Sequence, residues 1–155
     1  MTDKSILIRC NEYAKNMSTC CKAQVGTLVF RGSECISSGY NLSMPDNCKK
    51  LGCHRIAVYG EDSKNHRLPS DCLAIHSEIM AIAQATRHGV DLSMADMYIS
   101  RYPCEACARA IVAAGIKKVV YGGIEQISEM TERIFDLNNV EVTFIPIAWG
   151  GDTVD

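Results

Sequence analysis

The sequence lacks any hydrophobic run that approaches the roughly 20 residues needed by a transmembrane helix. Its first residues, MTDKSILIRC, contain no long apolar stretch ending in a small-residue cleavage site, so we expect no secretory signal and a cytoplasmic protein. There is also no internal repeat, low-complexity segment or linker-like stretch. We therefore expect residues 1–155 to form a single domain that buries its own core.

An excess of basic charge is also missing. The chain has 16 Lys and Arg residues against 18 Asp and Glu residues, which gives a formal net charge of −2. The nearest approach to a basic cluster is Lys49-Lys50, with Arg55 a little further on. A nucleic-acid-binding face would show a denser Lys/Arg cluster, so we expect no nucleic acid partner.

Cysteine, in contrast, is abundant. The chain has nine cysteines, an odd number. In a reducing cytosol, such thiols are more often metal ligands or core residues than disulfides. Metal binding is therefore the first hypothesis to test.

Hydrophobic periodicity and turn residues predict an α/β fold. Strands that alternate with helices indicate parallel pairing through right-handed crossovers. We expect a three-layer α/β/α sandwich with a mixed five-stranded sheet, whose leading hairpin is antiparallel and occupies central, buried positions. Residues 41–71 have no convincing periodicity, and 149–155 are expected to be a mobile end. The predicted helices cover residues 3–17, 75–88, 104–115 and 127–137; the predicted strands cover 24–30, 34–40, 95–101, 117–123 and 140–147.

The stretch YPCEAC places Cys104 and Cys107 three residues apart at the start of a predicted helix. This spacing brings both sulfurs to one side of the first turn, where free backbone N–H groups favour the thiolate. The pair alone fits a zinc site, a redox motif or two small core residues, and a third ligand would distinguish these possibilities.

His76 is the candidate third ligand, because it too opens a helix and would meet the cysteines at the carboxyl ends of the strands. The alternative is a capping or surface histidine. Three protein ligands leave one open position on a tetrahedral zinc ion, as in catalytic sites. Glu78, two residues further on, is then the candidate catalytic proton carrier, although an acidic residue also suits the first turn of a helix.

His76-Ser77-Glu78 together with Pro103-Cys104-Glu105-Ala106-Cys107 resembles the HxE and PCxxC signature of zinc-dependent nucleobase deaminases. Residues 25–41 and 113–121 are similar to elements of the deoxycytidylate (dCMP) deaminases, within the cytidine deaminase-like superfamily. The resemblance implies hydrolytic deamination of dCMP to dUMP and ammonia, by a zinc-activated hydroxide with Glu78 as proton shuttle. The dUMP would supply thymidylate synthesis.

The resemblance also implies positions that contact the substrate. Asn41, the last residue of GYN, would hold the deoxyribose, and Val25, Tyr102 and Tyr121 would border the nucleotide. Asn41 could equally be a turn residue, and the tyrosines could be core aromatics. The chain departs from the family pattern at Ser77, where alanine is usual, at Met80, where asparagine is usual, and at Leu42, where glycine is usual; these departures bear on substrate fit.

A second, structural zinc is implied for Cys20, Cys48, Cys53 and Cys72, which would hold the long irregular segment. The alternative is separate buried thiols. The resemblance further implies a homo-oligomer, often a hexamer, activated by dCTP and inhibited by dTTP, with Mg²⁺ present only with a nucleotide triphosphate effector.

Two other functions would explain part of these observations. A deaminase of dCTP, of deoxycytidine or of tRNA adenosine would use the same chemistry, although the weak basic character disfavours tRNA. A zinc-stapled binding module without catalysis would use the cysteines but would give Glu78 no role.

Overall fold

The computed structural model describes residues 1–43, 47–66 and 71–149. Within these ranges, no helix combines the length and the apolarity that crossing a membrane requires. The six residues after Trp149, predicted to belong to a mobile end, lie outside the described residues, as do two parts of the irregular segment, 44–46 and 67–70.

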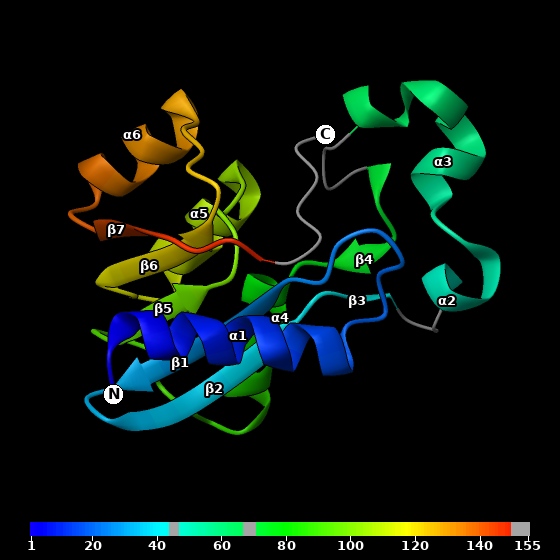
Figure 1. The fold of residues 1–155 in the computed structure, drawn as a ribbon. Helices are drawn as coiled ribbons and strands as arrows, with labels where there is room; N and C mark the ends of the chain where they lie inside the picture. Colours follow the sequence, from blue (N-terminus) through cyan, green and yellow to red (C-terminus); the bar gives the residue numbers. More distant parts are fainter. Residues whose placement is uncertain (44–46, 67–70, 150–155) are drawn as a thin grey trace.

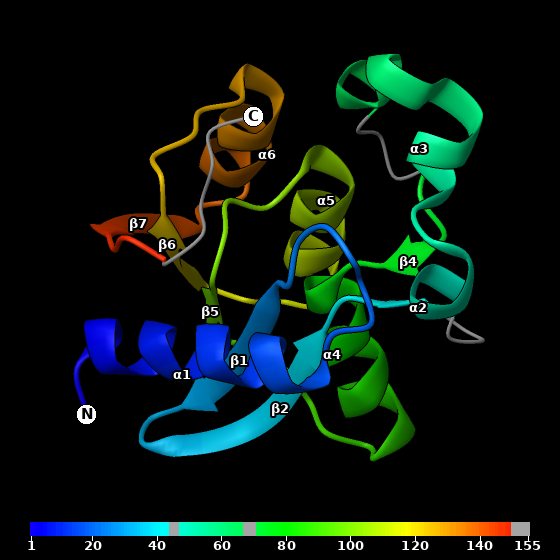
Figure 2. The same ribbon diagram turned by 45° about the vertical axis from the view of Figure 1, so that its right-hand side comes forward.

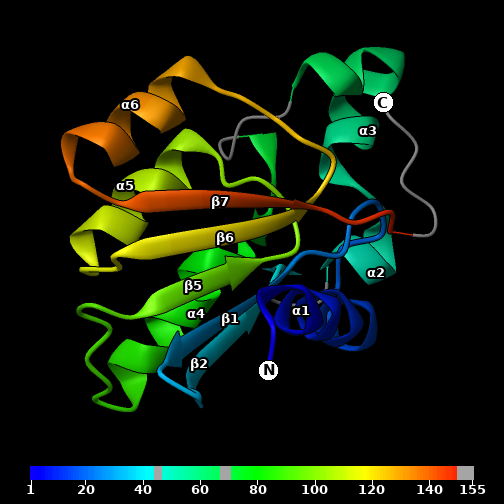
Figure 3. The same ribbon diagram turned by 60° about the vertical axis from the view of Figure 1, so that its left-hand side comes forward.

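The main sheet has five strands in the order β2-β1-β5-β6-β7 (Figure 3). The β1–β2 and β1–β5 pairs are antiparallel, whereas β5, β6 and β7 run parallel, so the predicted mixed sheet is confirmed. A small second sheet pairs β3 with β4. The strands are β1 (Gly26–Arg31), β2 (Glu34–Tyr40), β3 (Leu42–Ser43), β4 (Ala74–Ile75), β5 (Asp96–Ile99), β6 (Lys118–Gly123) and β7 (Glu141–Pro146).

Helices cover both faces of this sheet, with α1 on one face and α4 and α5 on the other (Figure 3). The three-layer α/β/α sandwich is therefore confirmed. The helices are α1 (Asp3–Met17), α2 (Asn47–Leu51), α3 (His54–Tyr59), the 3₁₀ helix η1 (Gly60–Asn65), α4 (Ser77–Arg87), α5 (Glu105–Ala113) and α6 (Glu129–Leu137).

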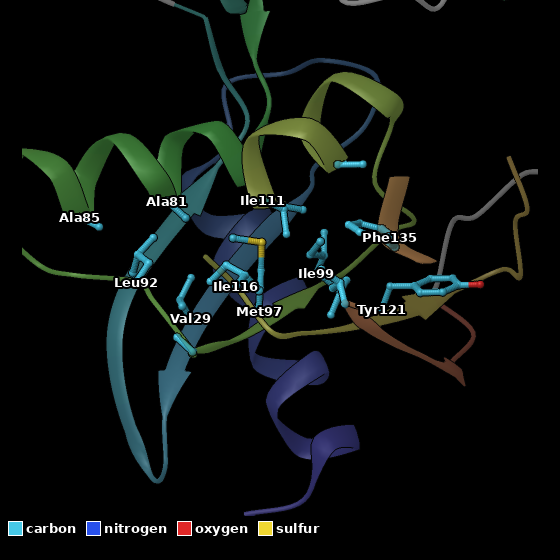
Figure 4. Packing of buried hydrophobic residues seen from close by; sticks show 14 residues of the cluster. Val29, Ala81, Ala85, Leu92, Met97, Ile99, Ile111, Ile116, Tyr121 and Phe135 are labelled. Atoms are coloured by element: carbon cyan, nitrogen blue, oxygen red, sulfur yellow. The ribbon is translucent and has the colours of Figure 1, made fainter. Parts of the chain in front are cut away.

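The strands bury both of their faces because their side chains alternate between two hydrophobic clusters. On β1, Leu28 and Phe30 join the cluster beneath α1, whereas Val29 joins the cluster beneath α4 and α5. Figure 4 shows this second cluster, in which Met97 and Ile99 of β5 meet Ile111 of α5. Burial on both faces explains why these strands have continuous apolar runs.

Helix α1 begins where its sequence predicts. Thr2 is its N-cap, and a capping box joins Thr2 and Ser5: each side-chain oxygen accepts a hydrogen bond from the backbone N–H of the other residue. Helix α4 ends at Arg87, and Gly89 follows with φ +66, a conformation that glycine adopts without strain.

Two expectations about the fold are wrong. Strand β2 is the edge of the sheet and is largely exposed or half-buried, not central. Trp149 is no part of a mobile end: it is buried, and its indole N–H donates to the carbonyl of Ser100 at 2.8 Å.

The segment from residue 41 to 71, for which no element was predicted, contains β3, α2, α3 and η1. These elements are too short to show a hydrophobic period, and α3 has no buried residue. Figures 1 and 2 show α2 and α3 grouped near β4, which leads directly into α4.

Candidate active site

His76 occupies the junction between β4 and α4. It is the N-cap of α4, with extended backbone angles, and its ring is half-buried. Because a cap residue lies outside the helical turns, its side chain is free of the apolar face that packs from Met80 onward. The fold thus places an imidazole at a rigid helix start.

Cys104 and Cys107 lie at the start of α5, which follows the carboxyl end of β5. Cys104 is the N-cap, and Cys107 lies one turn into the helix, where it is almost fully buried. The predicted i, i+3 spacing therefore directs both sulfurs towards the same point.

The two helix starts meet. Nδ1 of His76 lies 3.5 Å from Sγ of Cys104 and 3.4 Å from Sγ of Cys107, and all three donor atoms lie within 4.8 Å of one another. Zn–N bonds of about 2.1 Å and Zn–S bonds of about 2.3 Å at tetrahedral angles would separate nitrogen and sulfur by about 3.6 Å. The arrangement therefore fits a zinc ion with three protein ligands.

The charges in this cluster favour metal binding. Hydrogen bonding from Cys107, and then from His76, lowers the pKa of Cys104 to about 4, so that this sulfur is a thiolate at neutral pH. The same contact with Cys104 raises the pKa of His76 above its ordinary value. A divalent cation would replace the shared protons as the partner of these groups.

Glu78 lies beside the ligands without being one of them. Its side chain is 4% exposed, and burial raises its pKa above the ordinary value for a glutamate. The Ser77 hydroxyl donates to Oε2 of Glu78 at 3.0 Å and is itself hydrogen-bonded to the Thr27 hydroxyl at 2.8 Å. Thr27 of β1 thus helps to hold this carboxyl in place through the Ser77 hydroxyl.

A cavity of about 180 Å³ opens beside this group. His76, Glu78 and Cys104 line it, so two of the three candidate ligands and the candidate proton carrier face one open cavity. Its other lining residues are Cys20, Ala23, Val25, Asn41, Arg55, Cys72, Ala74, Ser77, Arg101 and Tyr102. The site has the arrangement of a metal-assisted hydrolase.

Comparison with known proteins agrees with this chemistry. Residues 1–123 match the family described as the cytidine and deoxycytidylate deaminase zinc-binding region. The chain belongs to this deaminase family.

Individual relatives support the assignment. The chain is 31% identical to the deoxycytidylate deaminase of Enterobacteria phage T2 over 133 residues, which cover 67% of this chain and 71% of the phage protein. It is 32% identical to the ComE operon protein 2 of Bacillus subtilis over 127 residues, 81% of this chain but only 61% of that relative. The crystal structure of the cyanophage S-TIM5 dCMP deaminase with dCMP and dUMP has the same fold, with a TM-score of 0.69 and 18% identity, covering 92% of this chain and 95% of that one.

Four residues of this chain were predicted to contact the substrate. Three of them line the cavity: Val25, Asn41 and Tyr102. The structure does not bring Tyr121 there. Tyr121 is buried in the core, 5.0 Å from Tyr102 between ring centroids, and its hydroxyl donates to the carbonyl of Gln126 at 3.3 Å.

The amide of Asn41 is largely occupied within the protein. Its Oδ1 accepts hydrogen bonds from the Ser18 hydroxyl and from the N–H of Val25, and its Nδ2 donates to the carbonyl of Ala23 at 2.6 Å. One N–H of the amide is left for a sugar hydroxyl. Asn41 therefore braces the wall of the cavity.

The four cysteines predicted for a second zinc lie in one region. Cys20 and Cys72 line the cavity, Cys20 and Cys48 lie near Cys72, and Cys53 lies near Cys21. Among the described residues, however, the four do not form a second group with donor atoms within 4.8 Å.

No role in the site was predicted from the sequence for the two arginines of the cavity wall. Arg55 comes from the irregular segment, where it counts only as part of a sparse basic run, and Arg101 precedes Tyr-Pro-Cys without belonging to the signature. The position of Arg101, three residues before the first cysteine, is the one signal that could have drawn attention to it.

Proposed function

We propose that this chain is a zinc-dependent deoxycytidylate deaminase that hydrolyses dCMP to dUMP and ammonia. The observation that carries the proposal is the meeting of His76, Cys104 and Cys107 at two helix starts, with the Glu78 carboxyl in the same cavity. Membership of the deaminase family supports it, and so do relatives named deoxycytidylate deaminase.

His76, Cys104 and Cys107 would hold the zinc ion. When bound, zinc supplies a Lewis acid that lowers the pKa of water towards about 7. The three ligands come from two helices that are anchored on one sheet, so the chain itself fixes where the water is activated.

Glu78 moves the protons of the reaction. Its carboxylate takes a proton from the attacking water and delivers it to N3 of cytosine, as oxygen bonds to C4. The second proton of the water then goes to the amino nitrogen on C4, whose bond to carbon breaks to release ammonia. The new C4 carbonyl completes uracil, so one water molecule is consumed for each ammonia released.

A substrate panel with zinc counted per chain tests the proposal. We expect ammonia release from dCMP at a higher kcat/KM than from dCTP, deoxycytidine or tRNA. A higher kcat/KM for another member of the panel would show that the chain is a deaminase with a substrate other than dCMP. Folded, zinc-loaded protein that is inactive on all of them would instead support the zinc-stapled binding module.

We propose in addition that Cys20, Cys48, Cys53 and Cys72 hold a second, structural zinc. Their common neighbourhood in the fold supports this. Metal analysis should give two zinc ions per chain, falling to one in Cys48→Ser with activity on dCMP largely kept. One zinc in the unaltered chain contradicts the second site.

The remaining proposals concern the whole protein. They are a single deaminase domain over residues 1–155, a cytoplasmic location, a homohexamer, and control by dCTP and dTTP, with Mg²⁺ accompanying the triphosphate. Light scattering with and without dCTP checks the oligomer, and dCMP saturation curves with each effector check the control.

A further inference from the structure

The wall of the active-site cavity contains two positive charges. Arg55 of α3 and Arg101, which follows β5, both line it. Glu78 is the one acidic residue among the described residues in this wall, and the reaction uses its carboxyl for proton transfer. Apart from the candidate metal ligands and Glu78, the charged side chains of this wall are therefore both cationic.

We propose that Arg55 and Arg101 bind the terminal phosphate monoester of the substrate and thereby restrict the enzyme to nucleotides over nucleosides. The inference rests on the proposed deaminase function and adds the groups that select the substrate class. Guanidinium groups match phosphate because they offer planar, paired donors to its oxygens.

Arg55 has a hydrogen-bonding capacity that the protein leaves unused. Its Nη1 donates to the carbonyl of His66 at 3.2 Å, and the guanidinium also interacts with the Cys53 thiol. Its Nε is buried and has no partner among the described residues. A buried charged donor without an acceptor is unfavourable, so a ligand oxygen would complete its hydrogen bonding.

Arg101 has a backbone that is fixed relative to the metal ligands. Its neighbour Ser100 donates its N–H to Gly26 and accepts the N–H of Gly26 on its hydroxyl, both at 3.0 Å. The carbonyl of Ser100 accepts from Trp149. Because Cys104 follows only three residues after Arg101, this anchoring holds the backbone of Arg101 close to that of the candidate zinc ligand, while the side chain of Arg101 is exposed and can reach a ligand.

The division of the cavity suits a mononucleotide. The reacting C4 atom and the 5′-phosphate lie at opposite ends of dCMP. The groups that donate hydrogen bonds to the phosphate must therefore line the same cavity as the metal ligands and must not bind the metal themselves. Arg55 and Arg101 meet this condition, while the Val25 and Ala23 side chains offer neutral surface. The net charge of −2 argues against a polynucleotide as the source of the phosphate.

The test compares dCMP with deoxycytidine in the zinc-loaded protein. Arg55→Gln and Arg101→Gln should each lower kcat/KM for dCMP by about 10- to 100-fold, mainly through KM, and leave deoxycytidine turnover nearly unchanged. Arg55→Lys should restore part of the loss, because it returns the charge without the planar donors. Arg9→Gln, an equal charge change at an exposed site on α1, is the matched control.

Equal losses for dCMP and deoxycytidine in the two variants would overturn the inference while leaving the deaminase function standing. Absence of ammonia release from any substrate in the unaltered chain would instead count against the function itself. A cytosine-containing oligonucleotide deaminated better than dCMP would also overturn the inference, because it would identify an internal phosphate.

Binding to the unaltered chain provides a measurement that needs no variant. By calorimetry, dUMP should bind at least about ten times more tightly than deoxyuridine, since only dUMP carries the phosphate. Inorganic phosphate should compete with dUMP. Equal affinity of dUMP and deoxyuridine would exclude a phosphate site in this cavity.

Discussion

Glu78 has two neighbours that decide how it can work. Ser77 donates a hydrogen bond to its carboxyl, and Thr27, near the start of β1, is hydrogen-bonded to the same serine hydroxyl. The carboxyl is thus oriented by two hydroxyl groups that are not candidate metal ligands. This support comes from the serine that departs from the usual alanine of the family signature.

Replacing Glu78 with Gln removes the proposed proton carrier and keeps the shape of the side chain. We expect kcat for dCMP to fall by about 100- to 10,000-fold, because general acid–base help is typically of that size. Zinc content, measured by metal analysis, should not change. Turnover at the unaltered rate would show that another group carries the proton.

Replacing Ser77 with Ala removes the hydrogen bond to Glu78 without adding bulk. The variant should fold, since alanine is usual at this position in the family, and kcat should fall by about tenfold at constant KM. Thr27→Val should cause a smaller loss, and the double variant should lose less than the sum of the two. Independent, additive losses would contradict a shared network.

The sequence predicts part of this residue-scale picture. His76, Glu78, Cys104 and Cys107 could be predicted because their roles depend on short spacings at helix starts, which the chain fixes locally. The contact between Ser77 and Thr27 could not, because 50 residues separate them and only the packing of α4 on β1 joins them.

At the scale of elements, the position of α4 against β2 depends on Gly39. A Cβ atom on Gly39 would lie 2.1 Å from the carbonyl oxygen of Ser77 and 2.4 Å from the amide nitrogen of Ala81. The Ser37 hydroxyl adds a hydrogen bond to the carbonyl of Ala81 at 2.6 Å. The first turn of α4, which carries Glu78, therefore lies directly on the backbone of β2.

Replacing Gly39 with Ala should push this turn away from the sheet. We expect the free energy of unfolding to fall by about 1–3 kcal/mol, measured by denaturant titration, together with at least a tenfold loss of kcat. Gly32→Ala is the control: its added Cβ meets nothing within 4 Å, but φ is +62. That variant should lose about 1–2 kcal/mol of stability and keep its activity.

The predicted elements succeed where they are long and regular. Helices and strands from α4 to β7 could be predicted because each has a clear hydrophobic period and a glycine or polar boundary. The edge position of β2 could not, since its composition resembles that of an inner strand and the order of strands depends on long-range pairing. Helix α3 packs too little apolar surface to leave a pattern.

For the whole molecule, a zinc ion held by His76, Cys104 and Cys107 would connect two helices that are distant in sequence. His76 is the N-cap of α4, and Cys104 is the N-cap of α5, so a bound ion would link the starts of these two helices. A metal ion that binds the folded chain but not the unfolded chain stabilises the folded chain by mass action. Metal content and thermal stability should therefore change together.

Chelation should lower the melting temperature of the unaltered chain, and added zinc should restore it, as seen by scanning calorimetry. Cys104→Ala should contain one zinc ion fewer per chain and should lack activity on dCMP. Cys35→Ala, which removes an exposed thiol, serves as the control and should match the unaltered chain in both respects. Full zinc content in Cys104→Ala would contradict its role as a ligand.

The hydrogen bonds that hold the Asn41 amide have a consequence for affinity. Because Ser18, Ala23 and Val25 already hold it, this part of the cavity rim is ordered before any nucleotide arrives. Little conformational entropy is then lost here on association, so more of the interaction free energy remains as affinity. Loosening the rim with Ser18→Gly would therefore weaken binding even though that residue lies outside the cavity wall.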